Sequence, residues 1–127
     1  MADVNRGNRP LSPHLQIYRP QMTAVSSIMV RITGIALFLL SFFVVWWLLA
    51  AATSEAAFAP IDWLMRSFIG DLVLFGGAWA IWYHMLGRLR HVIWDFGYCL
   101  DLETSIKMGQ LMFIVATALA FLTIVIV

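Results

Sequence analysis

The chain has 127 residues, of which 62% are hydrophobic and only 12% are charged, with a formal net charge of +1. Soluble globular domains carry about twice this charged fraction, so the composition excludes an ordinary soluble domain and predicts an integral membrane protein. The near-neutral charge argues against nucleic-acid binding, and the single cysteine, Cys99, excludes an internal disulfide.

The first 25 residues form a polar arm that contains Pro10, Pro13 and Pro20. Proline lacks a backbone N–H and breaks a helix interior, so the arm cannot be one continuous helix. The apolar run that follows is longer than the hydrophobic region of a signal peptide. We therefore expect it to remain in the protein as a membrane span.

Three apolar runs are long enough to cross a bilayer, which requires about 20 helical residues each. They predict transmembrane helices at about residues 28–52, 66–93 and 106–127. No internal repeat or second domain is evident. We therefore expect one all-α domain over residues 1–127, built as a bundle of three transmembrane helices with an N-terminal cytoplasmic arm, residues 1–25.

Basic residues are distributed unevenly between the two sides of this bundle. If the spans alternate, seven of the eight Lys and Arg residues fall on one side, and only Arg66 falls on the other. Positive residues in short flanks stay in the cytoplasm. The sequence therefore predicts a bacterial inner-membrane protein with a cytoplasmic N-terminus and a periplasmic C-terminus. The residues on the cytoplasmic side are Arg6, Arg9, Arg19, Arg31, Arg88, Arg90 and Lys107.

A polar stripe lies near the end of the second span. An ionisable side chain inside a span costs about 2 to 4 kcal/mol, so its presence there is by default a functional-site hypothesis. At 100° per residue, four polar side chains share one helix face, with the other three within about 40° of His84; they are His84, Arg88, His91 and Asp95. The small residues Gly77 and Ala80 continue this face and predict a slot for a flat ring beside the imidazole.

An imidazole in such a slot has three possible roles: a hydrogen bond between helices, a proton relay, or axial ligation of haem iron. If haem is bound, then Arg88, Arg90 or His91 would suit its propionates, because guanidinium groups pair well with carboxylates. A second axial histidine must approach from the opposite face of the ring. His91 lies on the same face of the same helix as His84, and His14 belongs to the polar arm, so the second ligand would come from another chain.

Ser27 and Arg31 are four residues apart, which makes them neighbours on one face if the first helix begins before Ser27. A hydroxyl and a guanidinium at the depth of the His84 stripe are suited to bind a quinone carbonyl and to stabilise negative charge on its oxygen. The alternative is an arginine that extends to the membrane surface beside an unrelated serine. Spacing alone does not decide between them.

Three segments together resemble a known family; they are residues 9–18, residues 27–34, and His84 followed by residues 90–95. In order and spacing they resemble the cytochrome b membrane-anchor subunit of succinate dehydrogenase, respiratory complex II. The resemblance covers nearly the whole chain. It implies a subunit that is not catalytic alone and that binds haem b together with a second membrane-anchor subunit, which supplies the other axial histidine. A flavoprotein subunit would oxidise succinate, and an iron–sulfur subunit would pass the electrons to ubiquinone.

The resemblance also assigns roles to individual residues. It implies that His84 is the axial ligand of the haem iron and that Arg31 and His91 lie near the haem propionates. It implies a quinone site that includes Ser27, Arg31 and Asp95. Two rival functions remain at this point: the anchor subunit of a quinol:fumarate reductase, and a structural membrane assembly protein without haem.

This sequence departs from the family pattern at two places. Val30 stands where the family commonly has a histidine. The glycine usually found four residues after the ligand histidine stands here at three, as Gly87, and Arg88 takes the fourth position. We expect Arg88 to turn toward the propionates or the haem edge to be approached differently.

Overall fold

The computed structural model describes residues 17–126, so the predictions for Arg6, Arg9 and most of the polar arm lie outside the described residues. The described part contains four α-helices: α1 (Met22–Thr53), α2 (Glu55–Met65), α3 (Phe68–Asp95) and α4 (Leu102–Ile126). Three of them, α1, α3 and α4, are long and apolar enough to cross a membrane. The predicted all-α membrane protein with three spanning helices is confirmed.

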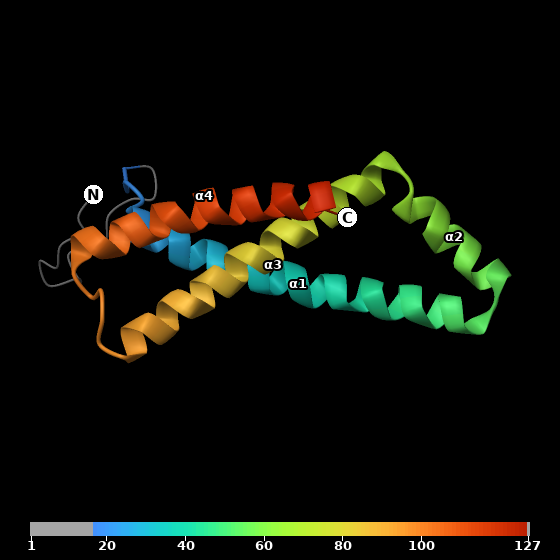
Figure 1. The fold of residues 1–127 in the computed structure, drawn as a ribbon, viewed down its shortest axis with the longest axis horizontal. Coiled ribbons are helices and arrows are strands. Elements are labelled where there is room, and N and C mark those ends of the chain that lie inside the picture. Colours follow the sequence, from blue (N-terminus) through green and yellow to red (C-terminus); the bar gives the residue numbers. More distant parts are fainter. Residues whose placement is uncertain (1–16, 127) are drawn as a thin grey trace, which may run out of the picture.

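The three long helices form a bundle in which α3 packs against both α1 and α4 (Figure 1). α1 and α4 begin at one end of the bundle, where α3 finishes. We call this the basic end, because Arg31, Arg88, Arg90 and Lys107 lie in this half. The opposite end, where α2 joins α1 to α3, is called the α2 end. α1 begins at Met22 and therefore contains Ser27, which meets the condition for pairing Ser27 with Arg31 on one face.

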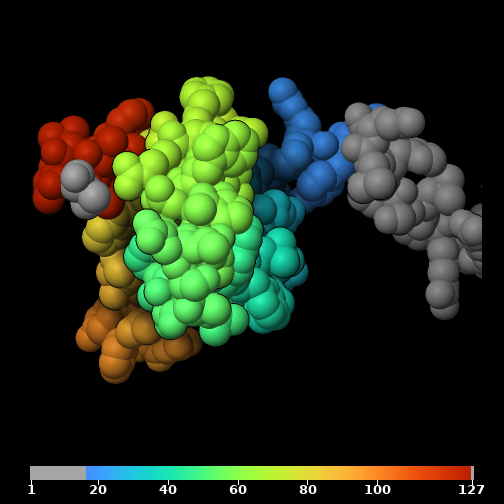
Figure 2. Space-filling model, turned by 90° about the vertical axis from the view of Figure 1, so that its right-hand side faces the viewer, coloured from blue at the N-terminus to red at the C-terminus, as the bar shows by residue number. Residues whose placement is uncertain are grey.

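Helix α2 was not predicted, because its 11 residues are too few to cross a bilayer. The signal for its start is Ser54, whose hydroxyl accepts a hydrogen bond from the Ala57 N–H at 3.2 Å, followed by the acidic Glu55. Ile61 is fully buried, whereas Trp63 on the same helix is exposed. Seen from the α2 end of the molecule, helix α2 lies across the end of the bundle (Figure 2).

The α3–α4 interface combines small residues with two indole hydrogen bonds. Trp79 Nε1 donates to Thr117 Oγ1 at 3.1 Å, and Trp82 Nε1 donates to Thr123 Oγ1 at 2.9 Å. Ala116 of α4 is fully buried beside the equally buried Tyr83 of α3. Such polar and close contacts matter because lipid removes the hydrophobic drive for helices to associate.

Helix α4 begins after a turn in which Asp101 provides the cap. Its carboxylate accepts a hydrogen bond from the Thr104 N–H at 2.8 Å. Hydrogen bonds from Thr104 favour the charged carboxylate and lower the pKa of Asp101 below its ordinary value. The turn also includes Gly97 at φ +80°, a conformation that glycine adopts without a steric cost. Asp101 thereby stabilises the first turn of α4.

Candidate functional site

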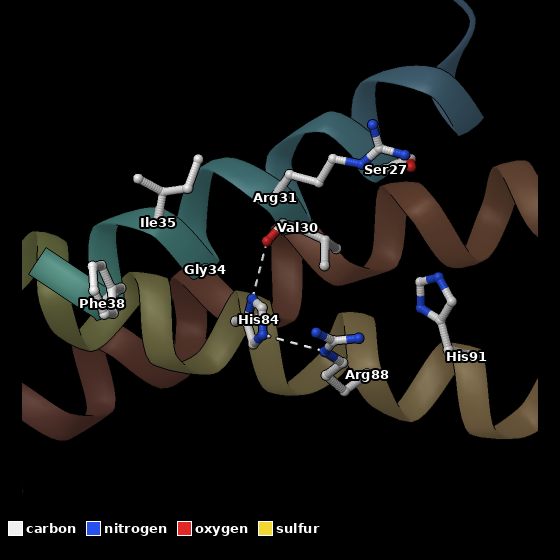
Figure 3. A pocket seen from close by; sticks show the side chains of 9 residues that line it. All are labelled: Ser27, Val30, Arg31, Gly34, Ile35, Phe38, His84, Arg88 and His91. Atoms are coloured by element: carbon white, nitrogen blue, oxygen red, sulfur yellow. Dashed lines mark hydrogen bonds between the residues drawn. The ribbon is translucent and has the colours of Figure 1, made fainter.

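A cavity of about 670 Å³ lies between α1 and α3 in the basic half of the bundle (Figure 3). Five of the seven residues predicted from the sequence as site residues line it: Ser27, Arg31, His84, Arg88 and His91. The other lining residues are Val30, Gly34, Ile35 and Phe38. Residues that are more than fifty positions apart in the chain are thus gathered in one place.

His84 lies between the two helices and its ring nitrogens have different partners (Figure 3). Nδ1 is 3.0 Å from the backbone carbonyl oxygen of Val30. A carbonyl only accepts, so Nδ1 carries the hydrogen and donates it. Nε2 then holds the lone pair, which accepts a hydrogen bond from Arg88 Nε at 3.3 Å. The imidazole is held in the tautomer that leaves Nε2 available as a ligand atom.

The space for this imidazole comes from Gly34 of α1. A Cβ atom at position 34 would lie 2.9 Å from His84 Cε1, closer than real contacts allow. Gly77 and Ala80, which were predicted to form a slot for a flat ring beside the imidazole, do not line the cavity. Ala80 is buried in the helix packing, and Gly77 lies against Leu40. Sequence reasoning missed Gly34, although it lies three residues after Arg31 and hence on the same helical face.

The two departures from the family pattern, Val30 and Gly87, are in contact with each other. Val30 is buried, and a Cβ atom added to Gly87 would overlap its Cγ2 methyl group. Gly87 therefore makes room for the valine side chain and lets α1 and α3 approach closely. That close approach brings the Val30 carbonyl within hydrogen-bond distance of His84.

The cavity has a polar side formed by the remaining predicted residues. Arg31 and Arg88 are exposed, whereas Ser27 and His91 are half-buried. His91 Nδ1 donates to the carbonyl oxygen of Gly87 at 2.7 Å. None of the residues that line the cavity is acidic, so the two guanidinium groups give this opening a positive charge that suits an anionic ligand.

Asp95 and Arg90 do not belong to this cavity. Asp95 is the last residue of α3 and is exposed, one turn beyond His91. Arg90 is almost fully buried on another face of α3. The suggestion that Arg90 pairs with propionates is therefore wrong. Arg90 follows His84 by six residues, so its side chain is rotated by about 240° around the helix axis relative to His84. The helical period therefore already places Arg90 on a different face from the polar stripe.

Within residues 17–126, no group of three His, Cys, Asp or Glu side chains gathers as a metal site. A single histidine is a suitable ligand for a metal that brings most of its ligands with it. Haem iron, which is held by four porphyrin nitrogens and by axial protein ligands, is such a metal. The donor set in the cavity, one imidazole nitrogen with two nearby guanidinium groups, fits an iron porphyrin with its two carboxylates.

Comparison with known proteins identifies the family. Residues 5–124 match the family described as succinate dehydrogenase/fumarate reductase transmembrane subunit. The chain belongs to this family. It is 52% identical to the succinate dehydrogenase cytochrome b556 subunit of Paracoccus denitrificans, over 99% of this chain and 97% of that protein. It is 39% identical to the succinate dehydrogenase cytochrome b560 subunit of Marchantia polymorpha, over 93% of this chain and 90% of that protein.

A third relative supports the same assignment. The chain is 39% identical to the succinate dehydrogenase cytochrome b560 subunit of Reclinomonas americana, over 83% of this chain and 76% of that protein. The three apolar helices agree with membership of this family of transmembrane subunits. The family resemblance carried by the three sequence segments is confirmed.

Proposed function

We propose that this subunit binds haem b at the His84 cavity, together with a second membrane-anchor subunit, and contributes to a ubiquinone-reduction site. The observation that carries the proposal is the orientation of His84. Its Nδ1 is bonded to the Val30 carbonyl, and its Nε2 holds the lone pair beside a cavity lined by arginines. The relatives, which are named as cytochrome b subunits, support the same cofactor.

When bound, haem would supply one-electron redox chemistry close to the quinone. The chain's own contribution is to hold and orient it. The carbonyl of Val30 fixes the imidazole plane and increases the basicity of Nε2. Arg88 is the side chain that hydrogen-bonds Nε2 in the structure, so it must move aside on binding, and the exposed position of Arg88 permits this. Arg31, Arg88 and His91 would then pair with the propionates.

A second axial histidine would come from the partner subunit. Residues 17–126 contain only two histidines, His84 and His91, and both project from α3 into the same cavity. His91 therefore cannot reach the opposite face of a ring held by His84. This geometry supports a site shared between two anchor subunits.

Ser27 and Arg31 would bind the quinone from the α1 side of the cavity. The Ser27 hydroxyl can donate to a quinone carbonyl, and the Arg31 guanidinium can stabilise the negative charge that develops on that oxygen as electrons arrive. A role for Asp95 in this site stays a prediction. The basic end would face the cytoplasm and the iron–sulfur subunit, with the flavoprotein subunit beyond it, so this chain alone would not oxidise succinate.

The direction of the reaction is proposed from the relatives. The family description covers both succinate dehydrogenase and fumarate reductase, whereas the similar proteins are named as succinate dehydrogenase subunits. Passage of electrons from succinate to ubiquinone is therefore preferred over the reverse reaction.

The haem ligand is tested by His84→Leu in the whole purified complex, with His91→Leu as a control in the same cavity. We expect His84→Leu to remove the low-spin signal of axially ligated haem from absorption and electron paramagnetic resonance spectra. His91→Leu should retain that signal. An unchanged signal in His84→Leu would show that another residue is the ligand, and a wild-type complex without b-type haem bands would favour the assembly protein without haem.

The quinone site is tested by Ser27→Ala and Arg31→Ala. Each variant should lower ubiquinone reduction while electron transfer from succinate to a soluble artificial acceptor continues. Arg66→Ala is the control, because Arg66 pairs with Asp62 at 2.9 Å at the α2 end. Equal loss of both activities in Ser27→Ala and Arg31→Ala would instead indicate failed assembly and would contradict the proposed site.

A further inference from the structure

Arg90 is a charged side chain that the proposed cavity does not use. It is only 2% exposed, and its guanidinium is packed inside the bundle rather than against lipid headgroups. Burial of a charge is costly unless the group is hydrogen-bonded or paired. The two ion pairs formed within residues 17–126 are Arg66–Asp62 and Lys107–Glu103, so Arg90 has no carboxylate partner there.

The guanidinium of Arg90 is instead held by neutral groups. Nη1 donates to Ser26 Oγ of α1 at 2.8 Å, and the guanidinium carbon lies 4.6 Å from the ring centre of Trp94. Among the described residues, Nε has no hydrogen-bond partner. Arg90 therefore makes one directed contact with another helix, and that contact is to Ser26.

Ser26 is the point where three helices meet. It is fully buried, and α4 approaches it at Gly109, where an added Cβ would lie 3.3 Å from Ser26 Oγ. A second residue of α3, Tyr83, donates its hydroxyl hydrogen to the Ser26 carbonyl oxygen at 3.3 Å. Both the side chain and the backbone of Ser26 are thus bonded to α3.

These contacts hold a helix start that has no cap of its own. Gln21 precedes α1 and makes no side-chain capping hydrogen bond. The next residue after Ser26 is Ser27, which lines the cavity, and Arg31 lies just over one turn further along α1. Because neighbouring residues differ by 100° in rotation, holding Ser26 toward the core sets the direction in which Ser27 and Arg31 point.

We propose that Arg90 is a positioning residue for the quinone site: it holds Ser26, and through it sets the height and rotation of Ser27 and Arg31 without touching the quinone. This inference rests on the proposed function of Ser27 and Arg31. A small rotation of the first turns of α1 would displace both side chains together. Quinone binding should therefore be affected more than turnover or haem ligation.

The test is Ser26→Ala in the whole complex, because alanine fits the buried position and removes only the hydroxyl. We expect about a threefold to tenfold rise in the KM for ubiquinone, the range that corresponds to loss of one hydrogen bond. The same factor should appear in the Kd of a quinone-analogue inhibitor. The maximal rate, the haem spectrum and electron transfer from succinate to a soluble acceptor should stay unchanged.

Ser105→Ala is the matched control. Ser105 is also a buried serine at the basic end, but its Oγ bonds the carbonyl of Cys99 in the α3–α4 turn at 3.3 Å. Its substitution should leave the KM for ubiquinone unchanged. Arg90→Lys keeps a charged donor and should be milder than Arg90→Gln, and adding Ser26→Ala to Arg90→Gln should cause no further rise.

Two results would overturn the inference by itself, and a third would overturn it together with the proposed function. In the first, Ser27→Ala raises the KM for ubiquinone but Ser26→Ala does not. This result would refute the role of Arg90 and would leave the proposed function intact. The other is an equal rise in Ser26→Ala and Ser105→Ala, which would mean general loosening of the bundle. If Ser27→Ala and Arg31→Ala themselves leave quinone reduction unchanged, the proposed function fails, and the role of Arg90 fails with it.

Discussion

The α1–α3 interface has two unlike halves. In the basic half, hydrogen bonds cross between the helices from His84, Tyr83 and Arg90, and Gly34 and Gly87 allow close approach. In the α2 half, the same helices border an apolar groove of about 700 Å³ lined largely by aliphatic side chains, among them Leu40, Val44 and Leu74. Directed contacts are concentrated in the half that contains the candidate site.

The difference follows from the solvent. Lipid is as apolar as leucine, so aliphatic contacts between helices do little to determine their relative position. Hydrogen bonds and contacts to small residues are directional and short-ranged, so they fix both height and rotation. A site that needs an imidazole, a serine and an arginine in register therefore requires the basic half to be built differently from the α2 half.

The largest expected effect is that of Gly87→Ala. The added methyl group would overlap Val30, whose branched side chain cannot turn away freely. We expect a loss of about 1–3 kcal/mol, as for other overpacked cores, measured as a lower midpoint of thermal unfolding of the complex in detergent. Adding Val30→Ala should restore much of the loss. No restoration would mean that the overlap is not with Val30.

The next effect is that of Gly34→Ala, compared with Gly76→Ala. An alanine at position 34 would push against the His84 imidazole, whereas a Cβ at Gly76 meets no atom within 4 Å. We expect the first variant to shift the haem absorption spectrum or to lower haem content, and the second to leave both unchanged. Equal spectra in the two variants would contradict the position given to His84.

A smaller effect is expected from Trp82→Phe. The variant loses the indole hydrogen bond to Thr123, while the hydroxyl of Thr123 keeps its bond to the Leu119 carbonyl. Hydrogen bonds between membrane helices contribute about 0.6 kcal/mol on average. Thermal unfolding should therefore begin slightly earlier, and the KM for ubiquinone should not change. A change in KM would indicate that the α3–α4 interface also sets the geometry of the cavity.

The smallest effect is expected from Gly77→Ala in the α2 half. The added Cβ would lie 3.0 Å from Leu40 Cδ1, the end of a flexible side chain beside the apolar groove. Leu40 can move, and alanine favours the helix, so stability should change by less than about 0.5 kcal/mol. A loss as large as that of Gly87→Ala would show that the two halves are packed equally tightly.

Several features could be predicted from individual residues. The three spans follow from their length and apolarity, and the gathering of His84, Arg88 and His91 on one face follows from the helical period. That these residues lie close to Ser27 and Arg31 could be expected because both groups sit at the same depth in the membrane, and because the family resemblance places them in one site. Helix α2 could not be predicted as a membrane span, because its 11 residues are too few to cross a bilayer. Its only early signal is the helix start at Ser54 and Glu55.

The sequence by itself determined the class of the protein, its membrane spans and its family, because hydrophobicity and short motifs are local properties of a chain. Only the tertiary structure decided that Gly34 accommodates His84, that Val30 and Gly87 are one contact, and that Arg90 holds Ser26. These contacts join residues of different helices. Periodicity states which face a residue occupies, but the packing of one helix against another decides what that face meets.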